Sequence, residues 1–233
     1  MEKKYKTEKD PGTGLLRIIA LKDFSNVKKG DRGGLIKSEY NLSQEGDCWV
    51  YEGASVFDNA EISGNARVFG WAKVYGYAQV GGDASVYGDA EVCRGAKVYG
   101  NARVGVAAKI AGDAEVYGNA RIYGKAYVHG YAKVYDNARV YGKASVHGDT
   151  KVYNNARVCG YVEVSGNALV GGNVKLWSSA LVDITDDINI ETNRDYVVSA
   201  FKKELYTITL GDLGDYYNIT DVKRIRQVYG KEI

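Results

Sequence analysis

The chain has 233 residues, with 31 Lys or Arg against 29 Asp or Glu, so its net charge is +2 at pH 7. This balance excludes a polyanion binder or a DNA mimic as a whole-molecule property, and a hydrophobic share of 45% excludes a disordered chain. Glycine is abundant at 29 residues whereas proline occurs once, which excludes collagen and favours many tight turns at regular positions.

The sequence shows no feature of export or membrane insertion. No apolar run approaches the ~18 residues of a membrane-spanning helix, and the start, MEKKYKTEKD, lacks the hydrophobic region of a signal peptide. Three cysteines are an odd number, which suits a reducing compartment better than a disulfide scaffold. We therefore expect a cytoplasmic protein with no membrane partner.

Residues 1–47 are expected to form a small N-terminal β cap. Apolar runs at residues 15–21 and 35–36 are separated by a turn-rich stretch at residues 28–34, KKGDRGG. This region precedes a long repeat, and the first unit of a repeat needs a cover for its core and its unpaired strand edge.

Residues 48–185 divide into 23 consecutive six-residue units, or hexads, without an insertion. Each hexad reads small, polar, aliphatic, aromatic or small, glycine-like, polar, as in residues 66–71 (ARVFGW) and 72–77 (AKVYGY). The small and aliphatic residues lie two apart, so both point to one face of an extended strand. Gly or Asn in the last two places permits a positive φ at a corner. Each hexad therefore predicts a short strand followed by a corner.

A longer period of 18 residues predicts three hexads per coil. The tetrapeptide Asn-Ala-Arg-Val/Ile begins at residues 65, 101, 119, 137 and 155, at intervals of 18 or 36. The fold class is therefore all-β dominated, a three-sided parallel β-solenoid in which residues 18 apart stack on neighbouring strands about 4.8 Å apart. The asparagines of these tetrapeptides are expected to form a hydrogen-bonded ladder at one corner. An α-helical repeat fits poorly, because six residues do not match 3.6 per turn.

These hexads resemble those of the hexapeptide-repeat, left-handed parallel β-helix proteins, and the left hand is implied by that resemblance alone. The chain departs from the family hexad in commonly placing Tyr directly after the aliphatic residue. Residues 15–54 are also similar to uncharacterised bacterial YdcK-type proteins, in the stretches IIALKDF (18–24), VKKG (27–30) with Gly33-Gly34, and LSQEGDCW (42–49). Members of that group have been called transferases, a label that rests mainly on the repeat.

Residues 186–233 are expected to form a small C-terminal α/β cap module, which could also carry an interaction of its own. Two strands are predicted within residues 196–210, and a helix over residues 220–229, with Thr220 at its start and Gly230 at its stop.

The sharpest candidate for function is a column of cations on the first side of the solenoid. Like charges about 5 Å apart repel by about 0.8 kcal/mol per adjacent pair even in water, and no acidic residue shares the column. One interpretation is a solvated ladder without a partner; the functional one is a site for an anionic partner. The candidate partner-binding residues are Arg67, Arg103, Arg121, Arg139, Arg157, Lys175, Lys125, Lys143, Tyr123 and Tyr141.

Two further sets of side chains are expected to stack. Tyr99, Tyr117, Tyr135 and Tyr153 form an aromatic column on the third side, which either stabilises the sheet or serves as an interface between copies of the chain. His129 and His147 are 18 apart on the second side, and related acyltransferases use a histidine as a general base. Such enzymes usually carry a protruding loop, which the uninterrupted hexads do not provide. With only two histidines, we expect no metal site, and no cofactor is predicted.

The leading functional hypothesis is a non-enzymatic scaffold that engages an acidic protein surface, or a nucleic acid, through the stacked Arg/Tyr side. An inhibitor of a host protein carried by a mobile element is one conceivable form of it. The first alternative is a hexapeptide-type acyltransferase that uses His129 or His147. The second is a structural, self-assembling solenoid.

Overall fold

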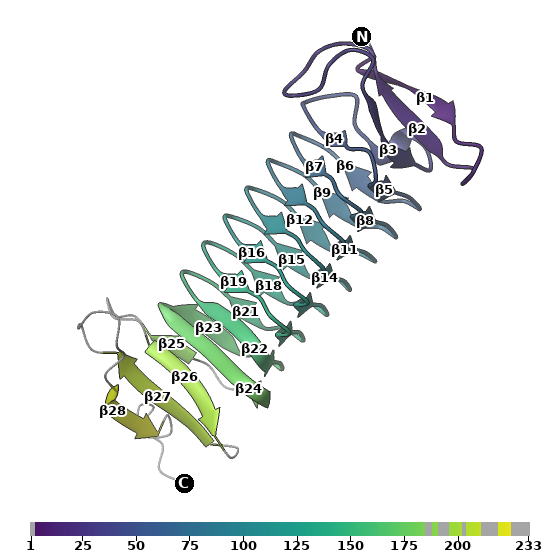
Figure 1. Cartoon of the computed structure of the whole chain (residues 1–233). Coiled ribbons are helices and arrows are strands. Elements are labelled where there is room, and N and C mark those ends of the chain that lie inside the picture. Colours follow the sequence, from purple (N-terminus) through teal and green to yellow (C-terminus); the bar gives the residue numbers. More distant parts are fainter. Residues whose placement is uncertain (1–2, 185–187, 191–195, 202–203, 211–218, 225–233) are drawn as a thin grey trace.

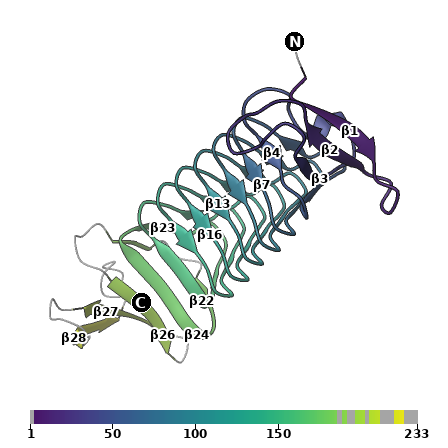
Figure 2. The same cartoon turned by 45° about the horizontal axis from the view of Figure 1, so that its top comes forward.

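The computed structural model describes residues 3–184, 188–190, 196–201, 204–210 and 219–224. Its central part is a stack of three-sided coils, with β1 (Tyr5–Lys9) at one end and β24 (Val174–Ile184) at the other (Figures 1 and 2). Most strands are two residues long, the polar residue and the aliphatic residue of one hexad, as the repeat predicts. No α-helix occurs among the described residues, where the single helical element is a 3₁₀ turn at Glu39–Asn41.

The strands form three parallel ladders, one for each side. The first side contains β4 (Trp49–Val50), β7 (Arg67–Val68), β10 (Ser85–Val86), β13 (Arg103–Val104), β16 (Arg121–Ile122), β19 (Arg139–Val140), β22 (Arg157–Val164) and β24 (Val174–Ile184). The second side contains β5 (Ser55–Val56), β8 (Lys73–Val74), β11 (Glu91–Val92), β14 (Lys109–Ile110), β17 (Tyr127–Val128), β20 (Ser145–Val146) and the end of β22. The third side contains β6 (Glu61–Ile62), β9 (Gln79–Val80), β12 (Lys97–Val98), β15 (Glu115–Val116), β18 (Lys133–Val134), β21 (Lys151–Val152), β23 (Leu169–Gly172) and β25 (Ile188–Ile190).

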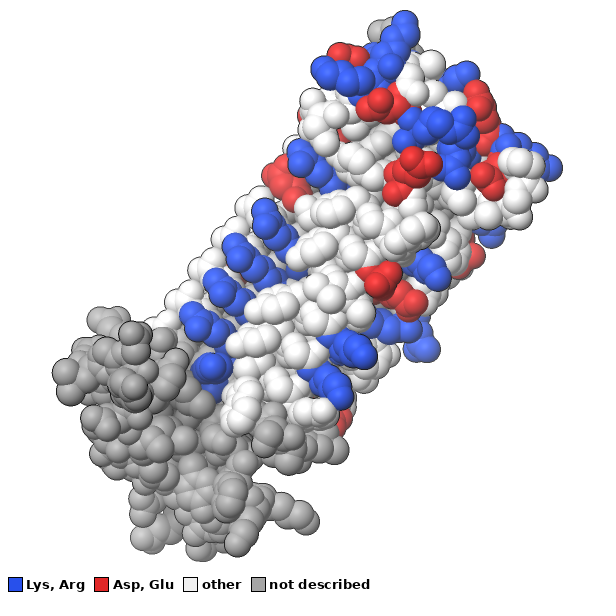
Figure 3. All heavy atoms as spheres, viewed as in Figure 1, with Lys and Arg blue, Asp and Glu red and all other residues white. Residues whose placement is uncertain are grey.

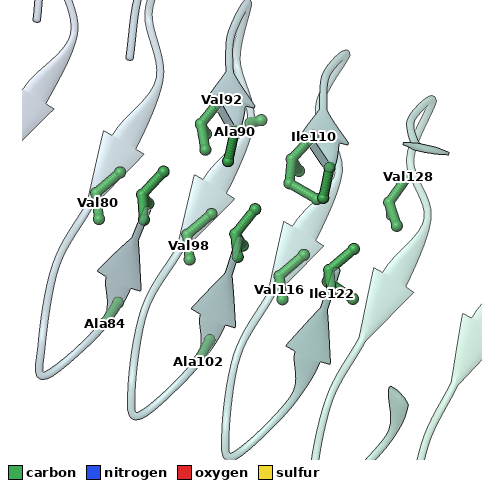
Figure 4. Close-up of a cluster of buried hydrophobic side chains, with 14 of the residues drawn as sticks. Val80, Ala84, Ala90, Val92, Val98, Ala102, Ile110, Val116, Ile122 and Val128 are labelled. Atoms are coloured by element: carbon green, nitrogen blue, oxygen red, sulfur yellow. The ribbon is translucent and has the colours of Figure 1, made fainter. Parts of the chain in front are cut away.

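The register is the predicted 18 residues through most of the stack. Val86 pairs with Val104, and Val116 with Val134, so aliphatic residues of successive coils lie one above the other. Val134 is fully buried, and the columns of Ala, Val and Ile form one continuous core along the axis (Figure 4). The predicted fold class of a parallel β-solenoid with 18-residue coils is therefore confirmed.

The corners depend on a backbone that glycine adopts most easily. The fifth residue of a hexad has a positive φ, as at Gly70 (72°) and Gly124 (75°). Asparagine in the sixth place does not have a positive φ, so tolerance of that conformation does not explain the asparagine column. The amides do form the predicted ladder, in which Asn119 Nδ2 donates to Asn137 Oδ1 at 3.3 Å.

The regular register ends in the last coil. Arg157 pairs with Lys175, 18 residues on, but Val162 pairs with Val182, which is 20 residues on and not the predicted 18. Ser178 stands where earlier coils have a corner glycine, and β24 holds two more residues than β22 between this position and the next pair, Val162 with Val182.

The N-terminal residues cover the first coil. Strands β1 (Tyr5–Lys9), β2 (Leu16–Ala20) and β3 (Arg32–Ile36) pair antiparallel, and the end of β3 then pairs in parallel with β5. Trp49, in an outward place of its hexad, is only 1% exposed because the rings of Tyr5 and Phe24 pack edge-on against it.

The C-terminal region contains the two predicted strands, but a third strand lies where a helix is predicted. β26 (Tyr196–Phe201) and β27 (Glu204–Leu210) are the two strands predicted there, and they pair antiparallel. The helix predicted from Thr220 is wrong over residues 220–224, which belong to β28 (Ile219–Arg224) and pair with β27. Ile219, Thr220 and Val222 are β-branched and suit a strand. Residues 225–229 of that helix lie outside the described residues. No described helix is long and apolar enough to cross a bilayer.

Candidate functional site: the arginine ladder

The first side of the solenoid presents a straight column of cations. Each belongs to the polar place of a hexad, directly before a buried aliphatic residue, so the strand turns it outward. Parallel pairing places Arg103 beside Arg121, Arg121 beside Arg139, and Arg139 beside Arg157. Figure 3 shows blue side chains aligned along the solenoid axis on this face. We call this column the arginine ladder; it consists of Arg103, Arg121, Arg139, Arg157 and Lys175.

Arg67 stands apart from the ladder. Ser85 separates it from Arg103 in the same column, and its guanidinium donates to Ser25 Oγ at 3.1 Å. Four of the five predicted arginines therefore lie in one column with Lys175, whereas Arg67 is hydrogen-bonded to the N-terminal region.

The ladder lacks a counter-charge on its own side. The first side and its flanking corners, residues 101–107, 119–125, 137–143, 155–161 and 173–177, hold seven Lys or Arg and no Asp or Glu. No ion pair joins a ladder residue to a carboxylate anywhere in the described part of the chain. The nearby Asp136, at the corner before Asn137, accepts a hydrogen bond from the Asn154 backbone N–H at 3.1 Å.

Tyr123 and Tyr141 lie beside the ladder as one stacked pair. Their ring centroids are 4.9 Å apart and the planes differ by 4°. Burial raises the pKa of both phenols, most strongly for Tyr141, so neither supplies a negative charge near neutral pH. The pair provides a half-buried apolar strip next to the cations.

The corner beyond these tyrosines adds two exposed lysines, Lys125 and Lys143. Lys143 Nζ donates to the Tyr161 hydroxyl at 2.8 Å and lies 4.6 Å from the ring centroid of that tyrosine. Tyr161 was not among the predicted residues. It stands one coil after Lys143 in the same corner column, and this spacing of 18 could have identified it.

The two histidines stack as predicted, with centroids 4.7 Å apart. His147 Nε2 lies 2.6 Å from Glu163 Oε1, a partner that the sequence reasoning missed. Desolvation, and then the charge of His147, lowers the pKa of His129. No group of three or more His, Cys, Asp or Glu side chains suited to a metal ion is found among the described residues.

The His147–Glu163 contact belongs to a recurring arrangement. Tyr75 donates to Glu91 at 3.2 Å and Tyr99 donates to Glu115 at 3.0 Å. In each case an aromatic residue in the fourth place of a hexad reaches a carboxylate 16 residues later, in the second place of the next coil. The histidine occupies a position at which other coils have a structural tyrosine.

The tyrosine column on the third side is satisfied within the chain. Tyr99, Tyr117 and Tyr135 stack at 4.9 and 5.0 Å with planes within 3°, and Tyr153 follows at 5.6 Å. Each ring covers the face of the next, and the ring of Tyr153 fills the space where a Gly171 side chain would stand. The use of this column as an interface between copies stays a prediction.

Fold and surface together define the protein as a parallel β-solenoid with a cationic side. A family model described as the YdcK Beta solenoid repeat matches residues 114–130 and 132–148, which begin one 18-residue coil apart. Among curated proteins, the "Uncharacterized acetyltransferase YdcK" of Escherichia coli (strain K12) is 50% identical over 38 residues. The aligned part is 16% of this chain and 12% of that protein. The resemblance to YdcK-type repeats is thus confirmed. The repeats that the family model matches lie in the middle of the solenoid.

Proposed function

We propose that the chain is a non-enzymatic scaffold that binds an acidic protein surface through the arginine ladder. The observation that carries the proposal is the register: five cations stack one per coil, and residues 101–107, 119–125, 137–143, 155–161 and 173–177, the first side and corners of those coils, include no carboxylate. A ladder held at this spacing repels itself, by about 0.8 kcal/mol per adjacent pair in water, and an anionic partner relieves that repulsion. Guanidinium groups also bind carboxylates in pairs of parallel hydrogen bonds.

The test removes the charge without removing the scaffold. Arg121, Arg139 and Arg157 are replaced together by Gln, and binding of fluorescently labelled poly-L-glutamate is measured by anisotropy. We expect the affinity of the triple variant to fall at least about tenfold, and the affinity of the unchanged protein to weaken steeply with added salt. The thermal midpoint should stay level or rise slightly, because a like-charge column has been removed.

A matched control uses the same hexad place on the other two sides. Lys73, Lys97 and Lys151 are all exposed, and their joint replacement by Gln lowers the net charge by the same three units as the arginine variant. This variant should bind as the unchanged protein does. If both variants lose affinity equally, binding follows net charge and the ladder is not the site.

The second candidate function is an acyltransferase. The contact between His147 and Glu163 supports it, because a carboxylate that orients a histidine is a common feature of general bases, and the curated relative is called an acetyltransferase. The test is a thermal shift with coenzyme A, followed by acyl transfer with His147→Ala and His129→Ala. Stabilisation by coenzyme A together with loss of transfer in either variant would replace the scaffold proposal.

A further inference from the structure

The spacing of the arginine ladder restricts the shape of the acidic partner. Neighbouring parallel strands lie about 4.8 Å apart, so the four steps from Arg103 to Lys175 cover about 19 Å in a straight line. A partner that fills every rung needs a carboxylate row of nearly the same spacing. Regular secondary structures differ widely in the spacing they offer.

An α-helix offers the closest match. Residues spaced alternately four and three apart lie on one face and rise about 5.3 Å per step, so five carboxylates span about 21 Å. The mismatch over the whole ladder is about 2 Å, which the flexible arginine side chains can absorb. On one face of an extended strand, residues recur about every 6.7 Å, so the mismatch grows to about 8 Å over the same four steps.

A nucleic-acid duplex fits less well. Its phosphates wind around the helix axis, whereas the ladder is straight and lies on a flat sheet, so contacts are limited to a short arc. The surface beside the ladder also differs from a phosphate-binding groove. One edge is the neutral asparagine ladder, and the other is the stacked pair Tyr123 and Tyr141, with Lys125 and Lys143 at the corner beyond it.

The width of this side also suits a helix. The ladder and the stacked pair Tyr123 and Tyr141 occupy the second and fourth places of a hexad, which puts them about 7 Å apart along the strand and so across the solenoid axis. A helix is about 10–12 Å across with its side chains, so one helix laid along the solenoid axis covers both columns. Its acidic row would meet the ladder, and a neighbouring apolar row would meet the two tyrosine rings.

We propose that the partner presents an α-helix with a single acidic row, laid parallel to the solenoid axis along the arginine ladder. This inference rests on the proposed function, because it names the shape of the partner that the ladder binds. Glutamates four apart on an isolated helix repel each other, so such a helix gains stability when the ladder neutralises them.

The experiment compares three labelled peptides of equal length, composition and charge with the full chain. The row peptide carries its glutamates alternately four and three residues apart on an otherwise alanine-rich and glutamine-rich helix. The dispersed peptide is also helical but distributes the same glutamates around the helix. All three peptides contain two prolines, which lie at the ends of the row and dispersed peptides. In the broken peptide the glutamates keep the row positions, but the two prolines change places with two central alanines, which prevents a continuous helix. A short DNA duplex forms a fourth arm.

We expect the row peptide to bind at least about tenfold more tightly than each of the other probes. This preference should disappear in the Arg121→Gln, Arg139→Gln, Arg157→Gln variant and persist in the Lys73→Gln, Lys97→Gln, Lys151→Gln variant. Two results would contradict the helical partner: the broken peptide binds as tightly as the row peptide, or the duplex binds more tightly. If that binding is also lost in the arginine variant, the ladder is still an anion-binding site, and only the helical shape of the partner is wrong. If the arginine variant binds every probe as well as the unchanged protein does, the ladder is no binding site and both proposals fail.

Discussion

At the scale of single residues, the corners show where this chain departs from its own repeat. Most corners have glycine in the positive-φ place, but Val106 occupies that place with φ of 63°, and this residue is 53% exposed. A β-branched residue in this conformation is strained by close contacts of its Cβ with the backbone. The Val106 carbonyl still accepts a hydrogen bond from the Asp89 backbone N–H, so backbone pairing with the previous coil holds the strained corner in place.

Replacing Val106 with Gly should stabilise the protein. Relief of the strain is worth about 1–2 kcal/mol, and the extra freedom of glycine in the unfolded chain offsets part of it, which leaves a gain of about 1 kcal/mol. Urea denaturation followed by circular dichroism would show it as a higher midpoint. The matched control is Gly124→Val at the same corner one coil on, where an added side chain would also meet the backbone of Gly142, and this variant should be destabilised.

His129 should make the stability of the protein dependent on pH. Its pKa is lowered in the folded protein, chiefly by desolvation and also by His147 and Arg94, while Glu163 acts in the opposite direction. The unfolded chain, with a pKa near 6.5, therefore binds a proton more readily than the folded one. The contribution of the neutral histidine is complete above pH ~6.5 and is lost as the pH falls through the lowered value.

The comparison variant is His129→Tyr, since tyrosine fills the fourth place of many hexads. The melting temperature of the unchanged protein relative to this variant should fall between pH 7.5 and pH 5 by a small amount, because the imidazole is partly solvated. A constant difference across this range would show that His129 does not titrate with folding.

At the scale of the elements, the strands are too short to be stable alone, and each depends on the coil before and after it. A two-residue strand has one outward and one inward side chain, so the buried aliphatic column carries most of the stabilisation. Burying a valine contributes about 1.5–3 kcal/mol relative to exposing it. The core is therefore sensitive to a single polar substitution in any coil.

Val134→Asp tests this dependence. The substitution places an unpaired carboxylate in a column where Val116 and Val152 are its fully buried neighbours, and it should destabilise the protein by several kcal/mol. The control is Lys151→Asp in the outward, exposed place of the next strand, which should change stability far less. Similar losses in chemical denaturation for the two variants would contradict the inward and outward assignment.

The repeat also explains which elements could be predicted from the sequence. Residues 18 apart share a column, so the period alone assigns Arg121, Tyr123 and His129 to their sides of the solenoid. Contacts between different hexad places, such as His147 with Glu163, do not follow from a column assignment, because they depend on how a long side chain leans. Residues 219–224 lack a repeat, so a local helix signal at Thr220 was misleading where pairing with β27 decides the structure.

At the scale of the whole molecule, the solenoid is quasi-one-dimensional: a coil contacts only its two neighbours. The arginine ladder and the tyrosine columns are properties of this stacking, since no single coil holds more than one rung. The length of the binding surface is therefore set by the number of coils. Removing one whole coil should shorten every column by one residue and leave the remaining coils unchanged.

Deletion of residues 119–136 tests this property because it removes one coil. Gly118 is then followed by Asn137, so the order of hexad places is kept and Arg103 should pair with Arg139 as it now pairs with Arg121. We expect the shortened chain to retain a β-sheet circular dichroism spectrum and to melt within several degrees of the parent, because it loses one coil interface and no cap.

Deletion of residues 119–139 is the control. It removes three further residues, so the coil cannot close, and the melting temperature should be much lower and the transition less cooperative. Because the 18-residue deletion keeps a continuous but shorter ladder, it should weaken poly-L-glutamate binding by about the contribution of one rung. Equal melting of the two deletions would show that the columns do not depend on an 18-residue register.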